Sequence, residues 1–328
     1  MRKVLWSALI IALLLTLMIS GSSCSKTASV TATPTSTVTI TPTSAPTPTA
    51  TLTAPPVSAW SAMRNGNASW LNGVWGSSAS DVFAVGTGGT ILHYNGSTWG
   101  NMNSSNDSDL YGVWGSSASD VFAVGGDGSI LHYDGSTWGN MSIGIAIYLR
   151  GVWGSSPSDV FAVGEYGAIL HYDGSAWSGM TSGSTNYLYG VWGSSPSDVF
   201  AVGEYGAILH YDGSAWGNMS SGTTNDLVGV WGNSLSNVFA VGLGGTILHY
   251  DGSAWSAMTS GTADTLWGVW GSSASDVFAV GADSIILHYN GSAWSAMNIN
   301  ATNTLYGVWG SSHSDVFAVG SRGTILHY

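Results

Sequence analysis

After residue 57, apolar residues come in short runs that are separated by turn residues, and this pattern repeats. The string Gly-Val-Trp-Gly begins at positions 73, 112, 151, 190, 229, 268 and 307, so every interval is 39 residues. The first copy reads LNGVWGSSASDVFAVGTGGTILHYNGSTWGNM. A fixed period of this length indicates a repeat architecture in which each copy folds as one structural unit.

Each copy contains four short segments rich in Val, Ile, Phe, Tyr and Trp, which predict four β-strands. In the first copy they are residues 71–76, 81–86, 89–94 and 97–102. The second and third segments are apolar at successive positions, as expected of strands that are covered on both faces. Asn-Gly or Asp-Gly joins the last two segments and predicts a hairpin with a type I′ turn, which requires positive φ at two residues.

Four strands in about 40 residues is the size of one blade of a β-propeller. The fourth-strand sequence of residues 292–297, SAWSAM, also occurs at residues 58–63, whereas the seventh copy reaches only its third strand at Tyr328. We therefore predict an all-β, seven-bladed β-propeller with four antiparallel strands per blade, closed by an N-terminal strand that completes the last blade. An open solenoid is the alternative, but it would need capping repeats.

The first 57 residues follow another pattern. Two basic residues precede an apolar run at residues 4–19, and Cys24, the only cysteine, follows shortly after. This order predicts a signal peptide at residues 1–23, and Cys24 resembles the lipidation site of bacterial lipoproteins. Ordinary cleavage with an incidental cysteine and an uncleaved N-terminal anchor are the alternatives.

Residues 24–57 are rich in Thr and Pro and contain no acidic or aromatic residue. Such a composition predicts an extended stalk, in which residues 27–57 alone would reach roughly 95 Å. We expect the propeller, residues 58–328, to be secreted and held at the outer face of the cell envelope through lipidated Cys24. The membrane would then be contacted only by this N-terminal anchor.

Composition excludes several classes of function. Charged residues make up only 7% of the chain, the formal net charge is −12, and only Arg64, Arg150 and Arg322 are basic after residue 60. Nucleic-acid binding requires clustered Lys and Arg, so we expect no nucleic-acid partner. A single cysteine also excludes an intramolecular disulfide and a Cys-based zinc site.

Comparison of the seven copies separates constant from variable connections. The loops between strands one and two (SSxSD) and three and four (YDGS) hardly vary, and they should share one edge of the ring, here called the uniform rim. The other connections should form the opposite edge, the variable rim, which is enriched in residue types favoured at binding hot spots and in sugar stacking. Unconstrained drift is the alternative explanation. The candidate ligand-binding residues on the variable rim are Trp70, Tyr111, Tyr148, Arg150, Glu165, Tyr166, Tyr187, Tyr189, Glu204, Tyr205, Trp267, Tyr306 and Arg322.

Histidine and aspartate recur once per copy on the uniform side. The histidines of neighbouring blades should lie more than about 10 Å apart, too far to share a zinc ion, whose ligands lie about 2 Å away. We predict structural histidines, no metal site, and aspartates that bond to nearby backbone N–H groups. We also expect the fourteen repeated tryptophans to form the core. The histidines are His93, His132, His171, His210, His249, His288 and His327. The aspartates are Asp81, Asp120, Asp159, Asp198, Asp276 and Asp315, with Asn237 in the fifth copy.

The repeated pattern V-x-x-x-x-x-D-V-F-A-V-G-x-x-G-x-I-L-x-x-D-G-S-x-W resembles the Asp-box (BNR) repeats. It is most similar to the blades of photosystem II assembly-factor and stability-factor propellers, although the turn is one residue shorter than a full Asp box and His replaces its leading Ser or Thr. The resemblance covers all seven copies and implies a propeller. Members of the family range from assembly factors to sialidases and cellulose-binding proteins, so the resemblance implies no single function.

Three functions remain open. We favour a non-catalytic binding module for a protein or glycan, monomeric and without a cofactor. A structural envelope or adhesive protein without a discrete ligand is the alternative. A sialidase-like glycoside hydrolase is the third possibility. It would need three arginines that converge on a carboxylate, as well as a Tyr/Glu pair, but sialidases have six blades, and the two Glu-Tyr pairs of this chain are copies of one another.

Overall fold

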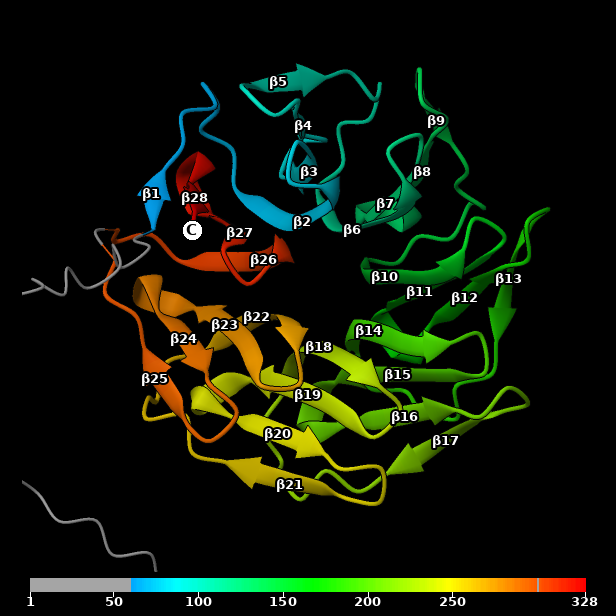
Figure 1. The fold of residues 1–328 in the computed structure, drawn as a ribbon. Coiled ribbons are helices and arrows are strands. Elements are labelled where there is room, and N and C mark those ends of the chain that lie inside the picture. Colours follow the sequence, from blue (N-terminus) through cyan, green and yellow to red (C-terminus); the bar gives the residue numbers. More distant parts are fainter. Residues whose placement is uncertain (1–59, 300) are drawn as a thin grey trace, which may run out of the picture. The chain divides into compact units, whose positions relative to one another are not determined.

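Seven four-stranded antiparallel sheets surround a common axis in the computed structural model (Figure 1). The structure describes residues 60–299 and 301–328. The seven-bladed propeller predicted from the repeats is therefore confirmed. The predicted signal peptide, Cys24 and the predicted stalk lie outside the described residues. Within these residues, no helix has the length and apolar character needed to cross a membrane.

Within each blade the strands follow one another from the axis of the ring to its periphery. Blade 1 consists of β2 (Leu71–Ser78), β3 (Asp81–Gly86), β4 (Ile91–Tyr94) and β5 (Trp99–Met102). Blade 2 consists of β6 (Leu110–Ser117), β7 (Asp120–Gly125), β8 (Ile130–Tyr133) and β9 (Trp138–Asn140). Blade 3 consists of β10 (Leu149–Ser156), β11 (Asp159–Gly164), β12 (Ile169–Tyr172) and β13 (Trp177–Met180). Blade 4 consists of β14 (Leu188–Ser195), β15 (Asp198–Gly203), β16 (Ile208–Tyr211) and β17 (Trp216–Met219).

The remaining blades repeat this order. Blade 5 consists of β18 (Leu227–Ser234), β19 (Asn237–Gly242), β20 (Ile247–Tyr250) and β21 (Trp255–Met258). Blade 6 consists of β22 (Leu266–Ser273), β23 (Asp276–Gly281), β24 (Ile286–Tyr289) and β25 (Trp294–Ala296). Blade 7 consists of β26 (Leu305–Ser312), β27 (Asp315–Gly320), β28 (Ile325–His327) and, from the other end of the domain, β1 (Ser61–Ala62).

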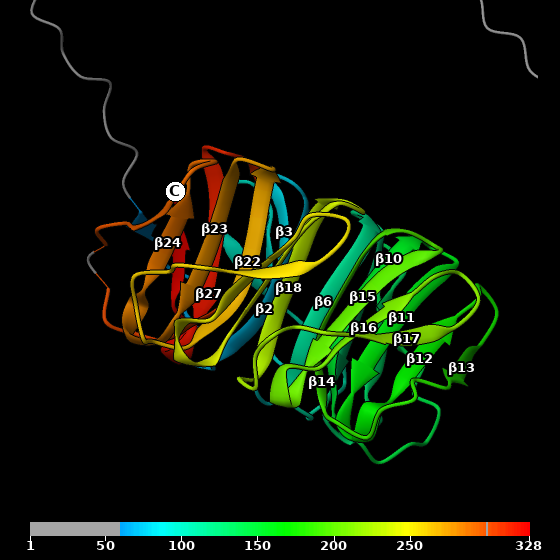
Figure 2. The same ribbon diagram turned by 90° about the horizontal axis from the view of Figure 1, so that it is seen from below.

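Single 3₁₀ turns connect the second and third strands of six blades. They are η1 (Gly126–Gly128), η2 (Glu165–Gly167), η3 (Glu204–Gly206), η4 (Leu243–Gly245), η5 (Ala282–Ser284) and η6 (Ser321–Gly323). The middle residue of each has positive φ. Figure 2 shows the blades along the length of their strands, with such connections gathered at the strand ends.

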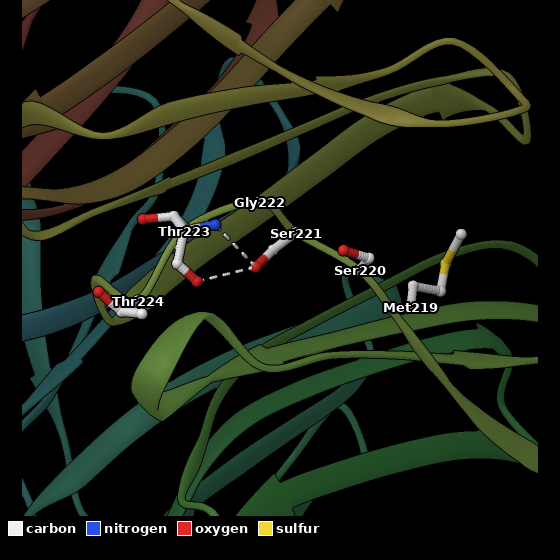
Figure 3. A pocket seen from close by; sticks show the side chains of 6 residues that line it. All are labelled: Met219, Ser220, Ser221, Gly222, Thr223 and Thr224. Carbon is white, nitrogen blue, oxygen red and sulfur yellow. Dashed lines mark hydrogen bonds between the residues drawn. The ribbon is translucent and has the colours of Figure 1, made fainter.

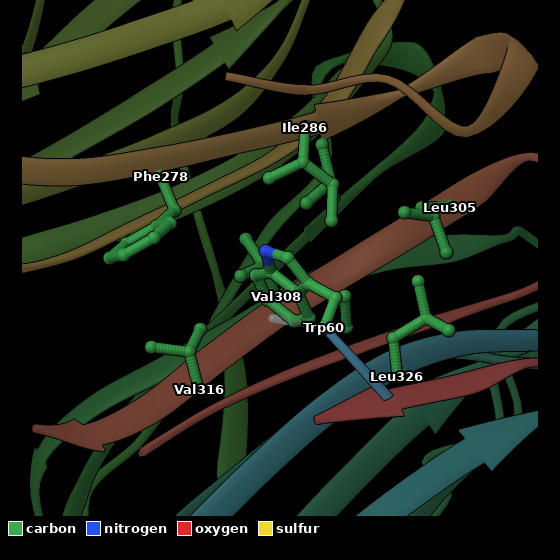
Figure 4. Close-up of a cluster of buried hydrophobic side chains, with 9 residues drawn as sticks. Trp60, Phe278, Ile286, Leu305, Val308, Val316 and Leu326 are labelled. Atoms are coloured by element: carbon green, nitrogen blue, oxygen red, sulfur yellow. The ribbon is translucent and has the colours of Figure 1, made fainter. Parts of the chain in front are cut away.

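The ring closes through the N-terminal strand, as predicted. Strand β1 pairs with β28 in the register Ser61↔His327 and Ala62↔Leu326, and Met63 N–H donates to the Ile325 carbonyl (2.9 Å). Trp60 is buried with Phe278 of blade 6, their rings 6.3 Å apart (Figure 4). Residues 58 and 59 of the predicted strand lie outside the described residues.

The core lies between neighbouring blades. Strand β3 is fully buried from Val82 to Val85, and the Val-Phe-Ala-Val sequence sends alternate side chains to both faces of its sheet. Phe83 packs with Val121 and Leu131 of blade 2. One such cluster of buried apolar side chains lies at each of the seven interfaces. The prediction that the second and third strands are covered on both faces is confirmed.

The Gly-Val-Trp-Gly string is explained by contact between blades. The Trp75 indole of blade 1 lies against Gly115 of blade 2, where an added Cβ would approach the ring to 2.7 Å. The same contact continues around the ring and closes it, because Trp309 lies against Gly76. The last glycine of the string is therefore required by the tryptophan of the preceding blade. The predicted core role is confirmed directly for most outer-strand tryptophans, such as Trp99, which is 8% exposed.

The predicted hairpin between the third and fourth strands forms, but the predicted turn type is wrong. Tyr94 pairs with Trp99 across a four-residue loop, and within it only Gly96 has positive φ. The Asn95 side chain instead accepts the N–H groups of Ser97 and Thr98, both at 3.0 Å. An Asx turn therefore replaces the type I′ turn. The Asn95 side chain stabilises the reversal of the chain through these hydrogen bonds, so a second residue with positive φ is not needed.

Candidate interaction surface

The connections divide between two rims as the sequence predicts. On the uniform rim the β2–β3 loop touches the β4–β5 loop so closely that a Cβ on Gly96 would lie 2.8 Å from the Ser80 Cβ. On the variable rim, Thr87 N–H donates to the Trp70 carbonyl, and Gly89 N–H donates to the Ser108 carbonyl of the next connection, both at 2.9 Å. The variable connections therefore form one continuous edge.

A repeated polar network fixes the uniform rim. In blade 1, Asp81 accepts a hydrogen bond from Ser77 Oγ (2.5 Å), and its other oxygen bonds to His93 Nε2 (2.7 Å). The His93 ring also contacts the buried ring of Phe83, with centroids 4.5 Å apart. The structural role predicted for the histidines holds in this geometry. The prediction that the aspartates bond to backbone N–H groups is wrong, because the partners found here are side chains of the same blade.

Blade 5 replaces the network rather than losing it. Asn237 stands at the Asp position and Asn233 at the Ser position. The Asn237 amide donates to Asn233 Oδ1 (2.8 Å), while Asn237 Oδ1 faces His249 Nε2 (2.7 Å). Burial lowers the pKa of His249 below its ordinary value of 6.5, an effect that the charge of Asp251 opposes. Two simultaneous changes thus keep the hydrogen bonds and remove the carboxylate.

The histidines do not gather into a metal centre. Each is bonded to the Asp or Asn of its own blade. Among residues 60–299 and 301–328, no three His, Cys, Asp or Glu side chains are arranged to hold a metal ion.

The main variable position of the inner strands is a β-bulge. In blade 1, Leu71 pairs with Gly86 and Gly73 with Val85, so Asn72 between them is an extra residue. The same irregularity occurs in all seven blades. A bulge leaves its extra residue out of the ladder and re-aims the side chain, which explains how this position tolerates different residues. The bulged residues are Asn72, Tyr111, Arg150, Tyr189, Val228, Trp267 and Tyr306.

In blades 2 and 3 this position builds a cation cradle from the chain's own residues. The Arg150 guanidinium lies 4.3 Å from the Tyr111 ring centroid and 5.2 Å from that of Tyr148. Glu165 lies 3.7 Å from Arg150 Nη2. Two aromatic faces and one carboxylate thus surround a guanidinium, an arrangement that favours a cation.

The two glutamates also have a local structural role. Glu165 accepts the N–H of Tyr148 (3.3 Å), and Glu204 accepts the N–H of Tyr187 (3.1 Å) and the hydroxyl of Tyr189 (3.4 Å). In blade 1, Thr87 Oγ1 serves the corresponding N–H of Trp70 (3.1 Å). The first turn position thus supplies a side-chain acceptor in blades 1, 3 and 4, whereas Gly126, Leu243 and Ala282 of other blades supply none.

The two Glu-Tyr turns present tyrosines in a strained conformation. Tyr166 and Tyr205 have φ of 58° and 54° and are 65% and 71% exposed, while Gly88 and Gly244 occupy the same position in blades 1 and 5. Positive φ is costly for an aromatic residue. Folding therefore does not explain why tyrosine stands where other copies have glycine.

Tyr166 is not isolated on the rim. Its ring meets that of Tyr187 of blade 4 edge to face, with centroids 5.2 Å apart. The neighbouring Tyr166 side chain, followed by partial burial and nearby negative charge, raises the pKa of Tyr187 to about 12. Together with Tyr148 and Tyr205, these side chains form what we call the tyrosine sector of blades 3 and 4.

A second aromatic group lies on the opposite part of the ring. The Tyr306 ring of blade 7 stacks on Trp70 of blade 1 (6.0 Å) and meets Trp267 of blade 6 edge to face (5.9 Å). Trp70 is 52% exposed. Arg322 stands at the exposed positive-φ position of η6, in the same blade as Tyr306. We call Trp70, Trp267 and Tyr306 the tryptophan sector.

The predicted site residues therefore lie on one rim but in two sectors. Exposure favours this rim, since Trp70, Ile143, Tyr148, Tyr166 and Tyr205 are the large apolar side chains exposed there, against only Leu235 on the uniform rim, within the described residues. The sequence analysis missed one rim residue, Asp226, whose carboxylate accepts the Tyr205 N–H (2.8 Å). Its place at a second variable position of the copies was the available signal.

A surface depression lies outside both sectors. It has a volume of about 600 Å³ and is lined by residues 219–224 alone, in the connection from β17 to β18 (Figure 3). There Ser221 Oγ donates to the Thr223 carbonyl and accepts the Thr223 N–H, at 3.2 and 3.4 Å. Its polar groups satisfy one another and no charged side chain lines it, so it offers no catalytic constellation.

The arginine arrangement that the hydrolase alternative needs is not formed. Arg150 lies in blade 3 and is held by Glu165. Arg322 lies in the turn of blade 7, and Arg64 lies between β1 and β2. Inner strand β10 neighbours β6 and β14, whereas β26 neighbours β22 and β2. The three arginines therefore lie in different parts of the ring and do not form one carboxylate-binding site.

Comparison with known proteins supports the fold. No family model matches the sequence, and no curated protein matches it. Among solved structures, the chain is similar to YCF48 bound to D1 peptide, with a TM-score of 0.69, 17% identity, and coverage of 82% of this chain and 96% of that one. YCF48 from Cyanidioschyzon merolae gives a TM-score of 0.67, 16% identity, and coverage of 82% and 98%. The WD40 propeller domain of Doa1 gives a TM-score of 0.69, 12% identity, and coverage of 81% of this chain and 94% of that one. The chain thus shares its propeller fold with YCF48 and with the WD40 domain of Doa1.

Proposed function

We propose that this chain is a non-catalytic interaction module whose variable rim binds a segment of a partner protein. The observation that carries the proposal is the pair of exposed tyrosines, Tyr166 and Tyr205, held at positive φ where two other copies have glycine and three have Asp or Arg. Backbone strain that folding does not require is characteristic of functional surfaces, and tyrosine is enriched at binding hot spots. The structural neighbour that is bound to D1 peptide supports a peptide ligand for this fold.

A glycan is the second candidate ligand, and the tryptophan sector favours it. Trp70, Tyr306 and Trp267 come from three successive blades, and Tyr306 contacts both tryptophans. An exposed indole beside a second ring offers the flat apolar face on which sugar rings stack. The two candidates use different sectors, so one set of variants can distinguish them.

We further propose that the module is displayed outside the cell. The support is the order of segments in the sequence, which places a signal-peptide pattern, Cys24 and a Thr/Pro-rich stretch before the propeller. Cys24→Ser should release the protein from the membrane fraction or leave its precursor unprocessed. An unchanged distribution in cell fractionation would contradict lipid anchoring without affecting the binding proposal.

Binding can be tested with full-length protein in detergent, panned against a random dodecapeptide library and applied in parallel to a glycan array. The informative variant is W70T/Y166G/Y205G, because each new residue already stands at the same position in another copy. We expect the affinity for selected peptides to fall roughly tenfold or more while thermal stability changes little. Separating the substitutions then assigns the ligand to a sector. The W70T variant should lower the affinity for glycans, and the Y166G/Y205G variant should lower the affinity for peptides.

A matched control lies on the other rim. Leu235 is 60% exposed, and three other copies have alanine at its position, so L235A removes a comparable apolar side chain from the uniform rim. Binding that survives in W70T/Y166G/Y205G and is lost in L235A would assign the ligand to the uniform rim. Enrichment of neither peptides nor glycans would support a purely structural protein instead.

A further inference from the structure

Blades 3 and 4 carry the same Glu-Tyr turn in two different electrostatic settings. In blade 3 the bulged residue is Arg150, whose guanidinium lies 3.7 Å from Glu165. In blade 4 the bulged residue is Tyr189, and its hydroxyl donates to Glu204 (3.4 Å). The first turn therefore has its own cation, whereas the second has an aromatic ring in the corresponding place.

Blade 5 adds a second carboxylate beside the turn of blade 4. One oxygen of Asp226 accepts the N–H of Tyr205 (2.8 Å). At the corresponding position beside the turn of blade 3, blade 4 has Tyr187. Among the described residues, ion pairs join Arg150 to Glu165 and histidines to aspartates, and none includes Glu204 or Asp226. These two carboxylates therefore carry negative charge that the chain does not neutralise by a direct pair.

The effect of both carboxylates is visible at Tyr189. Burial, followed by the charges of Glu204 and Asp226, raises the pKa of this side chain to about 12. The two charges thus act on the same side chain, at the start of inner strand β14, and the charge of Arg150 opposes them. Tyr205 itself is 71% exposed.

The cradle of Arg150 shows what such a combination accommodates. There, Tyr111 and Tyr148 place their rings 4.3 and 5.2 Å from the guanidinium, with one carboxylate beside it. At the turn of blade 4 the aromatic groups are Tyr189 and Tyr205, and two carboxylates replace one. The chemistry is the same, but the following bulged residue is Val228, which supplies no cation.

We propose that Glu204 and Asp226, together with the rings of Tyr189 and Tyr205, receive an arginine or lysine side chain of the partner protein. This inference rests on the proposed peptide-binding function and gives its ligand a chemical identity, a basic residue flanked by residues that contact the tyrosine sector. Charge complementarity selects a cation, because the exposed aromatic faces attract it and the two carboxylates strengthen the contact through charge-assisted hydrogen bonds.

The test begins with the dodecapeptides selected by full-length protein in detergent. Each selected peptide is resynthesised with citrulline in place of arginine, or norleucine in place of lysine, so that the charge is removed and the length kept. The protein variant E204Q/D226N removes both charges while its amide oxygens still accept the same N–H groups. The matched control is D109N/D283N. Asp109 accepts the Gly88 N–H (2.8 Å) as Asp226 accepts that of Tyr205, but it lies in another blade.

We expect the selected peptides to contain arginine or lysine and to lose affinity roughly tenfold on charge removal. E204Q/D226N should cause a similar loss and D109N/D283N almost none. In a double-mutant cycle, charge removal from the peptide should have little further effect on binding to E204Q/D226N. Affinity for wild-type protein should also fall as salt is added.

Two results would overturn the inference and leave the proposed function intact. One is selected peptides that lack basic residues but still require Tyr166 and Tyr205. The other is basic peptides whose affinity is equal for E204Q/D226N and wild type. Peptides that bind W70T/Y166G/Y205G as tightly as wild type would instead overturn both proposals.

Discussion

The two rims of this propeller meet the same requirement in different ways. On the uniform rim six blades close their loops with one design, a histidine and a serine bonded to a single Asp, as in His93, Ser77 and Asp81, and blade 5 keeps the same bonds with two asparagines. On the variable rim the acceptor for the first-strand N–H is Thr87 in blade 1 and Glu165 in blade 3. Both rims therefore satisfy their polar groups, but only one does so with fixed residues.

This difference separates two kinds of variation. Where a residue serves as an acceptor, as Thr87, Glu165 and Glu204 do, its local contact accounts for the polar residue, and the change carries no functional signal by itself. Where a residue makes no contact that folding needs and even adds strain, as Tyr205 does at φ 54°, another cause must maintain it. Variation on the variable rim is therefore informative only at the second kind of position.

The largest effect is expected on the uniform rim. In Asp198→Ala, His210 Nε2 and Ser194 Oγ lose their shared acceptor, which should lower the free energy of unfolding by about 1–3 kcal/mol. The control Asp107→Ala, at an exposed position of the variable rim, should change it by less than about 0.5 kcal/mol. Urea denaturation measures both. Equal losses would show that the rims contribute alike to stability and would remove the basis of the comparison.

Acid titration sharpens the comparison at the Asp-Gly-Ser turns. Hydrogen bonds from the following serine and backbone N–H groups lower the pKa of Asp134, Asp173, Asp212 and Asp251 from 3.8 to about 2. Because the folded-state pKa is depressed, this stabilisation is complete above pH 4 and is lost as pH falls toward 2. Asn95 and Asn290 stand at this position in other copies. The melting temperature of the quadruple Asp→Asn variant should therefore fall less steeply between pH 4 and pH 2 than that of wild type. A curve parallel to that of wild type would contradict this assignment.

The fifth blade offers a smaller test of the same network. The lowered pKa of His249 means that the unfolded chain binds a proton more readily, so stability is complete above pH 6.5 and declines as pH falls below that value. Asn237→Asp should raise the pKa of His249, because a carboxylate would then face the ring. NMR titration of the histidine follows this directly. An unchanged pKa would mean that the residue at position 237 does not control the charge of the ring.

The sequence predicts most of the fold because repetition makes each inference seven times over. The strand from Val199 to Val202, the closing role of residues 58–63 and the division of the rims all follow from alignment of the copies. The bulge at Asn72 does not, since Leu-x-Gly reads the same in a regular strand. The bond between Asp81 and His93 was also missed, because it depends on the register that pairs Val82 with Tyr94. For the site, pattern alone could locate the rim but could not tell exposed Tyr205 from half-buried Tyr189.

The smallest effect on stability, and the sharpest test of the comparison, is expected for Tyr205→Gly. Tyrosine at positive φ costs about 1–2 kcal/mol relative to its preferred conformations, whereas glycine adopts this region freely but loses more backbone entropy on folding. These terms nearly cancel, so the free energy of unfolding should change by less than about 1 kcal/mol. Gly88 and Gly244 already occupy this position in other blades. If urea denaturation instead shows a loss of several kcal/mol, Tyr205 serves the fold, and its exposure is no argument for a ligand. If stability is kept and affinity for the selected peptides is lost, the strain of this turn is maintained for recognition.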